Sequence, residues 1–302
     1  MADAPIETTP GGREAARRAR RRAAIDERPA LSPTGPAPDR LRVATWNLNS
    51  LRARTGALDR FLARTRPDIL CLQETKAATV VAPAMAVFDR HGYHVEHVGA
   101  GAYNGVAIAS RHPLAEVVPS GSFGDEALDR EPRAITAVVA APTALRVVSV
   151  YVPHGRALDH WHLRYKLDFL DALTDRAATW LGEGHVVVAG DVNVAATDSD
   201  VFHPDAFIGR THVSAPEREA LARLYATGLV DVDASRWGAR ARRFTWWDHG
   251  IGYSRNLGMR LDHLAVDPAL AARLDTTWID HTERGAERPS DHAALLADFA
   301  LA

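Results

Sequence analysis

Between Leu41 and Phe299 the chain alternates short β-branched, apolar runs with turns and helical stretches. Several runs are apolar on both faces, which is typical of strands in sheets that are covered on both sides. Many strands interrupted by helices predict one layered α/β domain. The predicted strands are Leu41–Leu48, Ile69–Gln73, Gly105–Ser110, Ala134–Ala140, Leu145–Val152, His185–Ala189, Phe244–Trp247, Arg260–Val266 and Ala293–Phe299, and the predicted helices are Arg54–Arg64, Val81–His91, Leu158–Leu181 and Pro216–Tyr225.

A segment of different composition precedes this pattern. Within residues 1–40, the stretch Arg13–Arg22 holds six arginines and one acid, and four prolines follow between Pro29 and Pro38. Such a segment cannot bury enough apolar surface to offset its ordering entropy, so we predict a disordered Arg/Pro-rich tail. Two interpretations of its arginine cluster remain open: the arginines are merely solvated, or they attach the protein electrostatically to nucleic acid. We expect residues 41–302 to form one folded domain, a length that one α/β domain can reach.

The net charge says little about partners. The chain has 36 basic and 38 acidic residues, a formal charge of −2, whereas nucleic-acid-binding domains are usually basic. Only Lys76 and Lys166 are lysines, so nearly all basic residues are arginines, whose planar guanidinium suits phosphate. A coding bias toward arginine would explain the same composition. Composition therefore does not decide whether the arginines serve to bind phosphate.

Cysteine content and hydropathy exclude several classes of protein. Cys71 is the only cysteine, which excludes an internal disulfide and a thiolate metal cluster. It lies in an apolar run, where we expect it to be a small buried hydrophobic residue. No apolar stretch approaches the length of a membrane span, and the N-terminus lacks the apolar core of a signal peptide. We therefore expect a cytoplasmic protein that does not associate with membranes.

Polar side chains gather where the predicted strands end. Site residues of sheet proteins commonly lie at strand ends and in the following loops. Each fragment alone is also explained by a turn with Asx hydrogen bonds or by a helix cap, but their number in one chain favours a shared site. These residues are Asn47 and Asn49, Glu74, Tyr151, Asp191 and Asn193, Asp262, and Asp291 with His292.

Carboxylate and amide oxygens next to one imidazole indicate a hard metal, Mg²⁺ or Mn²⁺. A zinc hydrolase is less expected, because the chain has no second cysteine and no His-x-x-x-His pair on a predicted helix. Such a metal neutralises phosphate charge while a carboxylate or imidazole takes a proton from water, which is the chemistry of phosphate-ester hydrolysis. His91, His94 and His97 lack companion ligands, and we interpret them as ordinary polar-face histidines.

The order of these motifs resembles the exodeoxyribonuclease III branch of the endonuclease/exonuclease/phosphatase superfamily, the apurinic/apyrimidinic endonucleases of base excision repair. The matches run from Ala44 to Asp298 and leave out the N-terminal tail. They are Trp-Asn-Leu-Asn-Ser-Leu-Arg-Ala-Arg from Trp46, Leu-Gln-Glu-Thr-Lys from Leu72, Tyr-Asn-Gly-Val-Ala from Tyr103, Tyr-Val-Pro-His-Gly from Tyr151, Tyr-Lys-Leu from Tyr165, Gly-Asp-Val-Asn from Gly190, Phe-Thr-Trp-Trp from Phe244, Ser-Arg-Asn-Leu-Gly-Met-Arg-Leu-Asp from Ser254 and Ser-Asp-His from Ser290.

The resemblance implies a four-layered α/β sandwich, with two central mixed sheets flanked by helices and the site where the sheet ends meet. It also implies roles for the residues at the strand ends. Glu74 binds the metal, with Asn49 and Asp291 supporting or joining the metal shell. Asp191 positions or deprotonates the attacking water, Asn47 orients Asp191, and Asn193 binds the phosphate. Asp191 and Asn193 are also counted among the metal-binding residues. Asp262 braces His292, which contacts a phosphate oxygen, and Tyr151 contacts the phosphate or leaving group and is the alternative base.

The resemblance further implies a DNA-binding face. Arg52 and Tyr103 match positions that grip the DNA backbone, and Arg156 is expected in the same groove unless it forms only a surface salt bridge. Trp246 and Leu261 line the implied pocket for a flipped-out abasic sugar.

Three positions depart from the family pattern. Met259 stands where close relatives often carry tryptophan, which implies a looser grip on the sugar. His154 replaces a common Asn or Gln, and Ser50 stands where glycine is common. None of the three removes an expected catalytic group.

The implied activity is that of a Mg²⁺- or Mn²⁺-dependent DNA-repair nuclease. It would hydrolyse phosphodiester bonds 5′ to abasic sites and remove 3′ nucleotides or blocking groups from duplex DNA, as a monomer in the cytoplasm near the nucleoid. The alternative within the superfamily is a phosphatase or phosphodiesterase that acts on a non-DNA phosphate ester. A catalytically inactive nucleic-acid-binding scaffold is a third possibility, which the complete set of acids disfavours.

Overall fold

Two six-stranded sheets form the centre of the computed structural model, which describes residues 33, 35, 39–140, 144–238 and 241–301. The Arg13–Arg22 stretch and most of the predicted tail lie outside these residues. The first sheet has the order β13 (Leu274–Asp280), β14 (Ala294–Ala300), β1 (Arg40–Asn47), β2 (Ile69–Gln73), β4 (Val106–Ser110), β3 (His94–Val98). The second has the order β5 (Leu114–Pro119), β6 (Ala134–Val139), β7 (Leu145–Tyr151), β8 (His185–Asp191), β12 (Asp262–Val266), β9 (Val230–Asp231).

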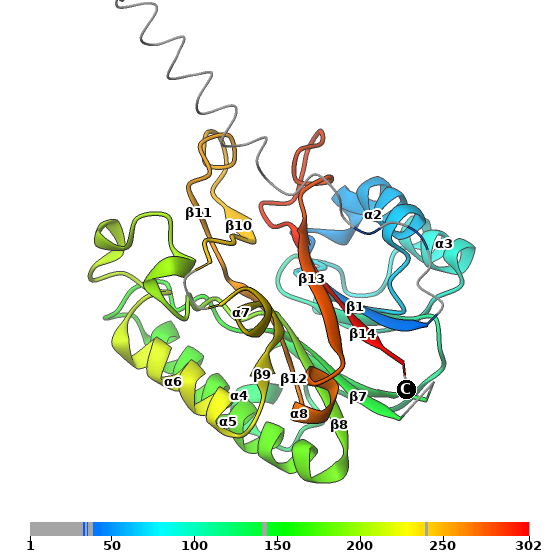
Figure 1. Ribbon diagram of the computed structural model, residues 1–302, viewed down its shortest axis with the longest axis horizontal. Coiled ribbons are helices and arrows are strands. Elements are labelled where there is room, and N and C mark those ends of the chain that lie inside the picture. Colours follow the sequence, from blue (N-terminus) through cyan, green and yellow to red (C-terminus); the bar gives the residue numbers. More distant parts are fainter. Residues whose placement is uncertain (1–32, 34, 36–38, 141–143, 239–240, 302) are drawn as a thin grey trace, which may run out of the picture.

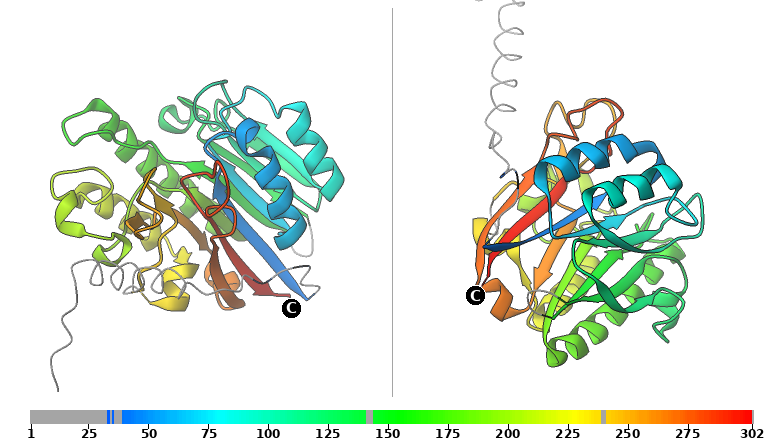
Figure 2. Two further views of the ribbon diagram at one scale, coloured as in Figure 1. Left: turned by 90° about the horizontal axis from the view of Figure 1, so that it is seen from above. Right: turned by 90° about the vertical axis from the view of Figure 1, so that its right-hand side faces the viewer.

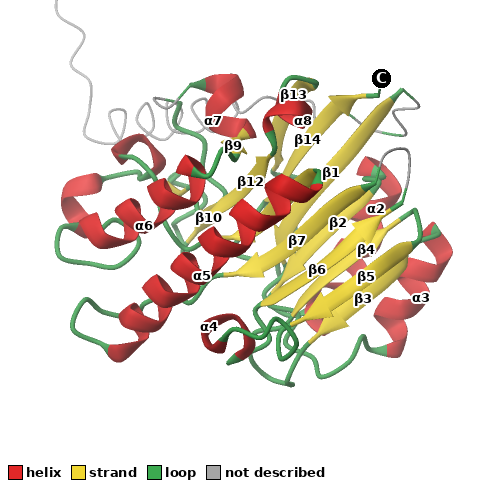
Figure 3. Cartoon of the chain, turned by 90° about the horizontal axis from the view of Figure 1, so that it is seen from below, coloured by secondary structure: helices red, strands yellow, loops and turns green. Residues whose placement is uncertain are grey.

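Helices cover the outer face of each sheet, which makes four layers (Figures 1 and 2). Helices α2 (Leu51–Thr65) and α3 (Ala82–His91) lie on the first sheet, and α5 (Trp161–Glu183) and α6 (Ala215–Ala226) lie on the second. Figure 3 shows α5 running across the second sheet. This arrangement confirms the predicted four-layered sandwich. Shorter elements complete the chain: α4 (Glu126–Asp129), α7 (Val232–Trp237), α8 (Pro268–Ala271), the 3₁₀ turns Asp198–Asp200 and Pro204–Phe207, and a hairpin of β10 (Trp246–Trp247) and β11 (Gly258–Met259).

Each sheet contains a parallel pair of strands, β1 with β2 and β7 with β8. The last residues of these pairs are in register: Asn47 opposes Gln73, and Tyr151 opposes Asp191. Antiparallel pairing of β12 then places Asp262 opposite Asp191. Because parallel strands end at the same edge of a sheet, the polar residues that follow them are brought to that edge.

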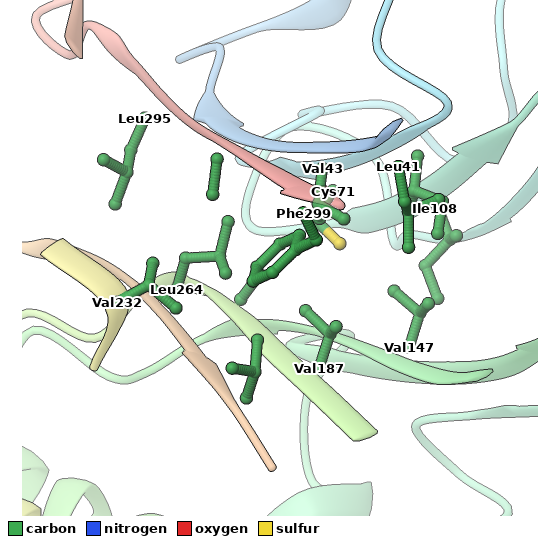
Figure 4. Packing of buried hydrophobic residues seen from close by; sticks show 14 of the residues in the cluster. Leu41, Val43, Cys71, Ile108, Val147, Val187, Val232, Leu264, Leu295 and Phe299 are labelled. Carbon is green, nitrogen blue, oxygen red and sulfur yellow. The ribbon is translucent and has the colours of Figure 1, made fainter. Parts of the chain in front are cut away.

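The main core lies between the two sheets (Figure 4). Alternate residues of the interior strands point into it, among them Val43, Ile108, Val187 and Phe299, all without exposed surface. Cys71 is also fully buried here, as predicted, and burial raises the pKa of its thiol to about 12. Within the described part of the chain, no helix combines the length and apolar character needed to cross a membrane.

The predicted elements differ from the structure mainly at the sheet edges. The prediction missed β3, β5, β9, β11 and β13; the ladders of β5 and β13 contain register shifts, which interrupt the alternation that sequence patterns reveal. The predicted strand Phe244–Trp247 is wrong in its first half, since only Trp246–Trp247 pairs as a strand. Thr245 instead accepts hydrogen bonds at Oγ1 from the backbone amides of Leu261 and Asp262, both at 3.0 Å.

Phe299→Ala is expected to lower the free energy of unfolding by about 3–5 kcal/mol, because it leaves a cavity between the sheets. Ile208→Ala is a matched control, since Ile208 is 79% exposed, and it should change stability by no more than about 0.5 kcal/mol. Urea denaturation with an unchanged slope measures both values. Equal destabilisation by the two variants would contradict the assignment of Phe299 to the core.

Candidate active site

Several site residues follow their strands in a left-handed backbone conformation. Asn49, Glu74 and Asn193 have φ of 48°, 49° and 56°, a region that residues other than glycine rarely adopt. Ser50 has φ of 107°, a backbone conformation that glycine adopts more easily than serine. Such strain is often found at functional sites, where surrounding contacts must hold the backbone in place.

Asn47 links the two sheets at the centre of the site. Its Nδ2 donates to Glu74 Oε1 at 3.0 Å and to Asp191 Oδ2 at 2.9 Å, while its Oδ1 accepts from the Asn49 amide at 3.0 Å. The side chain is fully buried, so no water competes for these bonds. Since carboxylates only accept hydrogen bonds, this orientation of the amide follows from its neighbours. Asn47 therefore fixes both acids at once.

Lys76 and Asn49 hold the acids on the side of the first sheet. Lys76 Nζ lies 2.8 Å from Glu74 Oε2 and donates to Asn49 Oδ1, and Asn49 Nδ2 donates to Asp291 Oδ1 at 2.9 Å. Burial opposes ionisation of Glu74, but hydrogen bonds from Lys76 and Asn47 outweigh it and lower its pKa. The pKa of Asp291 is also lowered, because His292, Asn49 and Trp246 together outweigh its burial.

His292 lies between two acids of the second sheet. Its Nδ1 is 2.7 Å from Asp262 Oδ2, and its Nε2 is 3.6 Å from Asp191 Oδ2. Burial disfavours the imidazolium, yet the charges of Asp262 and Asp191 raise the pKa of His292 to about 10. Burial raises the pKa of Asp191 to about 7; the charge of His292 opposes this shift, and the charges of Asp262 and Glu74 add to it. Asp262 Oδ1 is buried and has no hydrogen-bond partner among the described residues.

Tyr151 and Asn193 complete the site. Burial, followed by the charges of Glu74 and Asp191, raises the pKa of Tyr151 well above its usual value. The Arg133 guanidinium lies 4.7 Å from the centre of the Tyr151 ring. The Asn193 amide donates to Asp191 Oδ1 at 3.0 Å, and Asn193 Nδ2 donates to the Val152 carbonyl at 2.9 Å. One hydrogen of this side-chain amide remains for a ligand.

A cavity of about 620 Å³ lies beside these residues. Trp246 and Met259 line it, and Trp246 Nε1 donates to Asp291 Oδ2 at 3.2 Å, which joins the cavity to the acids. Leu261 is only 2% exposed and packs with Met259 in an apolar cluster, so it supports the wall rather than forming it. Other lining residues include Arg156, Arg210, His154 and His212.

The structure thus brings together the expected acids, amides, Tyr151 and His292. Arg52 and Tyr103 do not join this group of residues. Both side chains are exposed, and Tyr103 is 79% exposed. His91 contacts Asp59 and His97 contacts Thr75, so these two histidines have separate partners.

Lys76 and Arg54 support the site, although the sequence pattern assigns neither of them a role. Lys76 holds Glu74, and Arg54 donates to the carbonyls of Asn49 and Pro289. The rarity of lysine in this chain is a signal for Lys76, whereas nothing distinguishes Arg54 among so many arginines.

In metal-free protein, His292 is expected to remain protonated at neutral pH, and Asp262→Asn should lower its pKa by removing the nearest negative charge. Because the folded-state pKa is raised, this contribution to stability is complete below the unfolded-state value near 6.5 and is lost as pH rises through about 10. NMR titration of the histidine ring carbons measures both effects. His97 serves as control, since burial lowers its pKa independently of Asp262. An unchanged His292 titration in the variant would contradict this account.

Comparison with known proteins agrees with the geometry. Residues 44–292 match the endonuclease/exonuclease/phosphatase family. Exodeoxyribonuclease III of Haemophilus influenzae is 29% identical over 86% of this chain and all of its own length. The 3′ phosphatase NExo from Neisseria, solved with a product DNA hairpin, superposes with a TM-score of 0.79 at 36% identity, covering 86% of this chain and 99% of that chain. An AP endonuclease from Archaeoglobus fulgidus gives the same TM-score and coverage at 35% identity. The chain therefore belongs to the endonuclease/exonuclease/phosphatase family and resembles its exodeoxyribonuclease III and AP endonuclease members.

Proposed function

We propose that the protein is a Mg²⁺- or Mn²⁺-dependent DNA-repair nuclease that cleaves 5′ to abasic sites and removes 3′ nucleotides or blocking groups from duplex DNA. The observation that carries this proposal is the convergence of Glu74, Asp191 and His292: one carboxylate oxygen of each acid and one ring nitrogen of His292 lie within 4.8 Å of one another. Similarity to an exodeoxyribonuclease III, to an AP endonuclease and to a phosphatase solved with product DNA supports a DNA substrate.

The donor set fits a hard divalent cation. Glu74 is ionised and only partly buried, and Asn49 and Asp291 offer further oxygens next to it. His292 is a poor ligand in comparison, because a protonated imidazole has no free lone pair. Glu74 would hold the metal, Asn49 and Asp291 would support it, and Asp191 and Asn193 would border it. When bound, the cation would supply Lewis-acid stabilisation of phosphate charge.

Asp191 is the preferred general base. A pKa of about 7 lets its carboxylate accept a proton from water near neutral pH. The raised pKa of Tyr151 keeps that hydroxyl protonated, so Tyr151 is better suited to donate a hydrogen bond to the phosphate or leaving group. Asn47 and the Asn193 amide hold the two oxygens of Asp191 and fix its direction.

His292 and Asn193 would stabilise the phosphate. The imidazolium is held by Asp262 at Nδ1, which leaves Nε2–H to face the oxygens beside Asp191. A cation that is already oriented and desolvated stabilises developing negative charge without further reorganisation. The free hydrogen on Asn193 Nδ2 would bind a second oxygen.

The DNA would contact a local basic and aromatic surface rather than a uniformly basic face. Arg52, Tyr103 and Arg156 are exposed and would hold the backbone. An abasic sugar would enter the cavity at Trp246 and Met259, with Leu261 supporting the wall behind them.

In a test with Mg²⁺ and a duplex that contains one abasic analogue, the purified protein should cut the strand 5′ to the lesion, and EDTA should stop the reaction. Asp191→Asn and Glu74→Ala should each lower kcat by about 100- to 10,000-fold, since they remove the base and the main metal ligand. Asp175→Asn on the exposed face of α5 is the matched control and should keep full activity. Gel electrophoresis of the labelled strand measures all four proteins.

Failure to cut this duplex, combined with hydrolysis of a soluble phosphomonoester, would favour the phosphatase alternative. Full activity of Asp191→Asn would reject the assigned site. Failure to hydrolyse either substrate would favour the inactive scaffold.

The arginine-rich stretch Arg13–Arg22 is proposed to add sequence-independent contacts to DNA phosphates. Truncation before Leu41 should weaken binding and reduce the slope of log affinity against log salt by about 0.9 for each phosphate that this stretch neutralises. Fluorescence anisotropy at several salt concentrations measures this slope. An unchanged affinity and slope would make the segment a passive tail.

The active protein is proposed to be a cytoplasmic monomer associated with the nucleoid.

A further inference from the structure

Lys166 is a fully buried cation directly behind the candidate active site. It lies on α5 within the Tyr-Lys-Leu motif, and neither Lys166 nor its partner Glu217 has exposed side-chain surface. Only this lysine and Lys76 occur in a chain whose other basic residues are arginines. Lys76 contacts Glu74 at the front of the site, so both lysines lie at the site.

The Lys166 ammonium uses all three of its hydrogens. Nζ donates to Glu217 Oε1, to the Asn193 carbonyl at 2.7 Å and to the His154 carbonyl at 3.3 Å. An ammonium presents three donors from one atom in a tetrahedral arrangement, whereas arginine presents donors in a plane. Lysine therefore fits a point where three acceptors converge from different directions, which explains its presence in an arginine-rich chain.

Two residues of one loop also contact these carbonyls. His212 Nδ1 lies 2.6 Å from the Asn193 carbonyl. Thr211 Oγ1 lies 2.9 Å from the His154 carbonyl and 2.6 Å from Glu217 Oε1, and its single hydrogen is shared between these two acceptors. Since a carbonyl only accepts, His212 Nδ1 must carry a hydrogen. The loops that follow β7 and β8 are thus tied to each other and to the segment before α6.

Glu217 anchors this arrangement in a helix. Its Oε2 accepts from the amide and hydroxyl of Ser214 in a capping box at the start of α6, and its Oε1 accepts from Thr211 Oγ1 at 2.6 Å and from the His212 amide at 2.9 Å. The loop after β7 passes directly over the pair: a Cβ on Gly155 would lie 2.5 Å from Thr211 Oγ1 and 3.3 Å from Lys166 Cδ.

A stabilising role alone explains this pair poorly. Removing two charges from water costs several kcal/mol for each ion, and apolar replacements of buried pairs are often equally stable. Burial lowers the pKa of Lys166, whereas the lysine lowers the pKa of Glu217 to about 2 against its own burial. The pair has, by contrast, an evident effect on geometry, because Asn193 also donates to Asp191 Oδ1.

We propose that Lys166, held by Glu217, is a positioning residue that fixes the backbone of Asn193 and thereby aims both Asn193 and Asp191 at the scissile phosphate. The inference rests on the proposed function. It assigns the Tyr-Lys-Leu motif a role in alignment, with Lys166 acting through Asn193 and not on the substrate.

The test compares Lys166→Met with the double variant Lys166→Met/Glu217→Met. The single variant leaves a buried carboxylate without its cation and should lower Tm, whereas the double variant should regain most of the lost Tm. If Lys166 positions the site, kcat stays about 100-fold below wild type in both variants, the loss expected of a misplacement near 1 Å, with a smaller change in KM. Recovery of kcat together with Tm in the double variant would overturn the proposal.

The control is a buried ion pair at the far end of β1. Arg42 donates at Nε to Asp298 Oδ1 at 2.7 Å, with 4% and 1% exposed side chains. Arg42→Met/Asp298→Leu should shift Tm while keeping kcat within about twofold, because additivity holds for distant sites. Loss of kcat in this control equal to that of the Lys166 variants would show a general effect of destabilisation and reject the proposal.

A gentler variant and a second measurement keep the test decisive if the Lys166 variants do not fold. Thr211→Val keeps the charges but removes the hydroxyl that contacts both Glu217 Oε1 and the His154 carbonyl, and should lower kcat about tenfold because the buried pair and the loop after β7 lose this shared contact. Unchanged kcat in Thr211→Val would count against a role of these loop contacts in positioning the site.

Hydrogen exchange at the Asn193 backbone amide should accelerate in Lys166→Met and in the double variant but not in the Arg42 control. This readout does not need nuclease activity, so inactive wild-type protein would reject the proposed function, and unaltered exchange would reject the positioning role.

Discussion

Parallel pairing of β1 with β2 and of β7 with β8 is the constraint on which the site depends. Each pair delivers the ends of two strands to one edge of its sheet, and face-to-face packing of the sheets brings those two edges together. Asn47 then makes the connection, since a single buried amide donates to an acid from each sheet. A shift of one residue in either pair would turn these side chains to the opposite face.

The acids at this edge are only partly neutralised before any ligand arrives. Lys76 contacts Glu74, and the single imidazolium of His292 faces both Asp262 and Asp191, so each of these three acids has a cationic partner. Partners of different strength also separate the acids chemically: Glu74 stays ionised, whereas Asp191 has a pKa near neutrality. This difference in surroundings suits the two acids to the separate roles proposed for them, metal ligand for Glu74 and base for Asp191.

Arginine and lysine are used differently in this molecule. Arg42 and Arg260 form buried pairs with carboxylates through more than one guanidinium nitrogen, for which a planar fork is well suited. The two lysines occupy places where one ammonium must join acceptors from separate segments. A composition dominated by arginine therefore conceals two positions at which a point charge is required. The formal charge of −2 is likewise an average over the whole chain, and it does not give the charge of any one surface.

The sequence by itself determined the interior strands, the four long helices α2, α3, α5 and α6, the burial of Cys71 and the polar residues at the strand ends. These features depend on local periodicity and on residue type, which are visible along the chain. The edge strands β5 and β13 were not predictable, because bulges and half-exposed positions weaken their alternation. Only the tertiary structure decided that Asn47 joins Glu74 to Asp191, that Leu261 lies behind the cavity wall, and that Lys166 reaches the carbonyl of Asn193. Those contacts link residues that are distant in sequence, and their geometry is set by how two sheets pack and not by any local pattern.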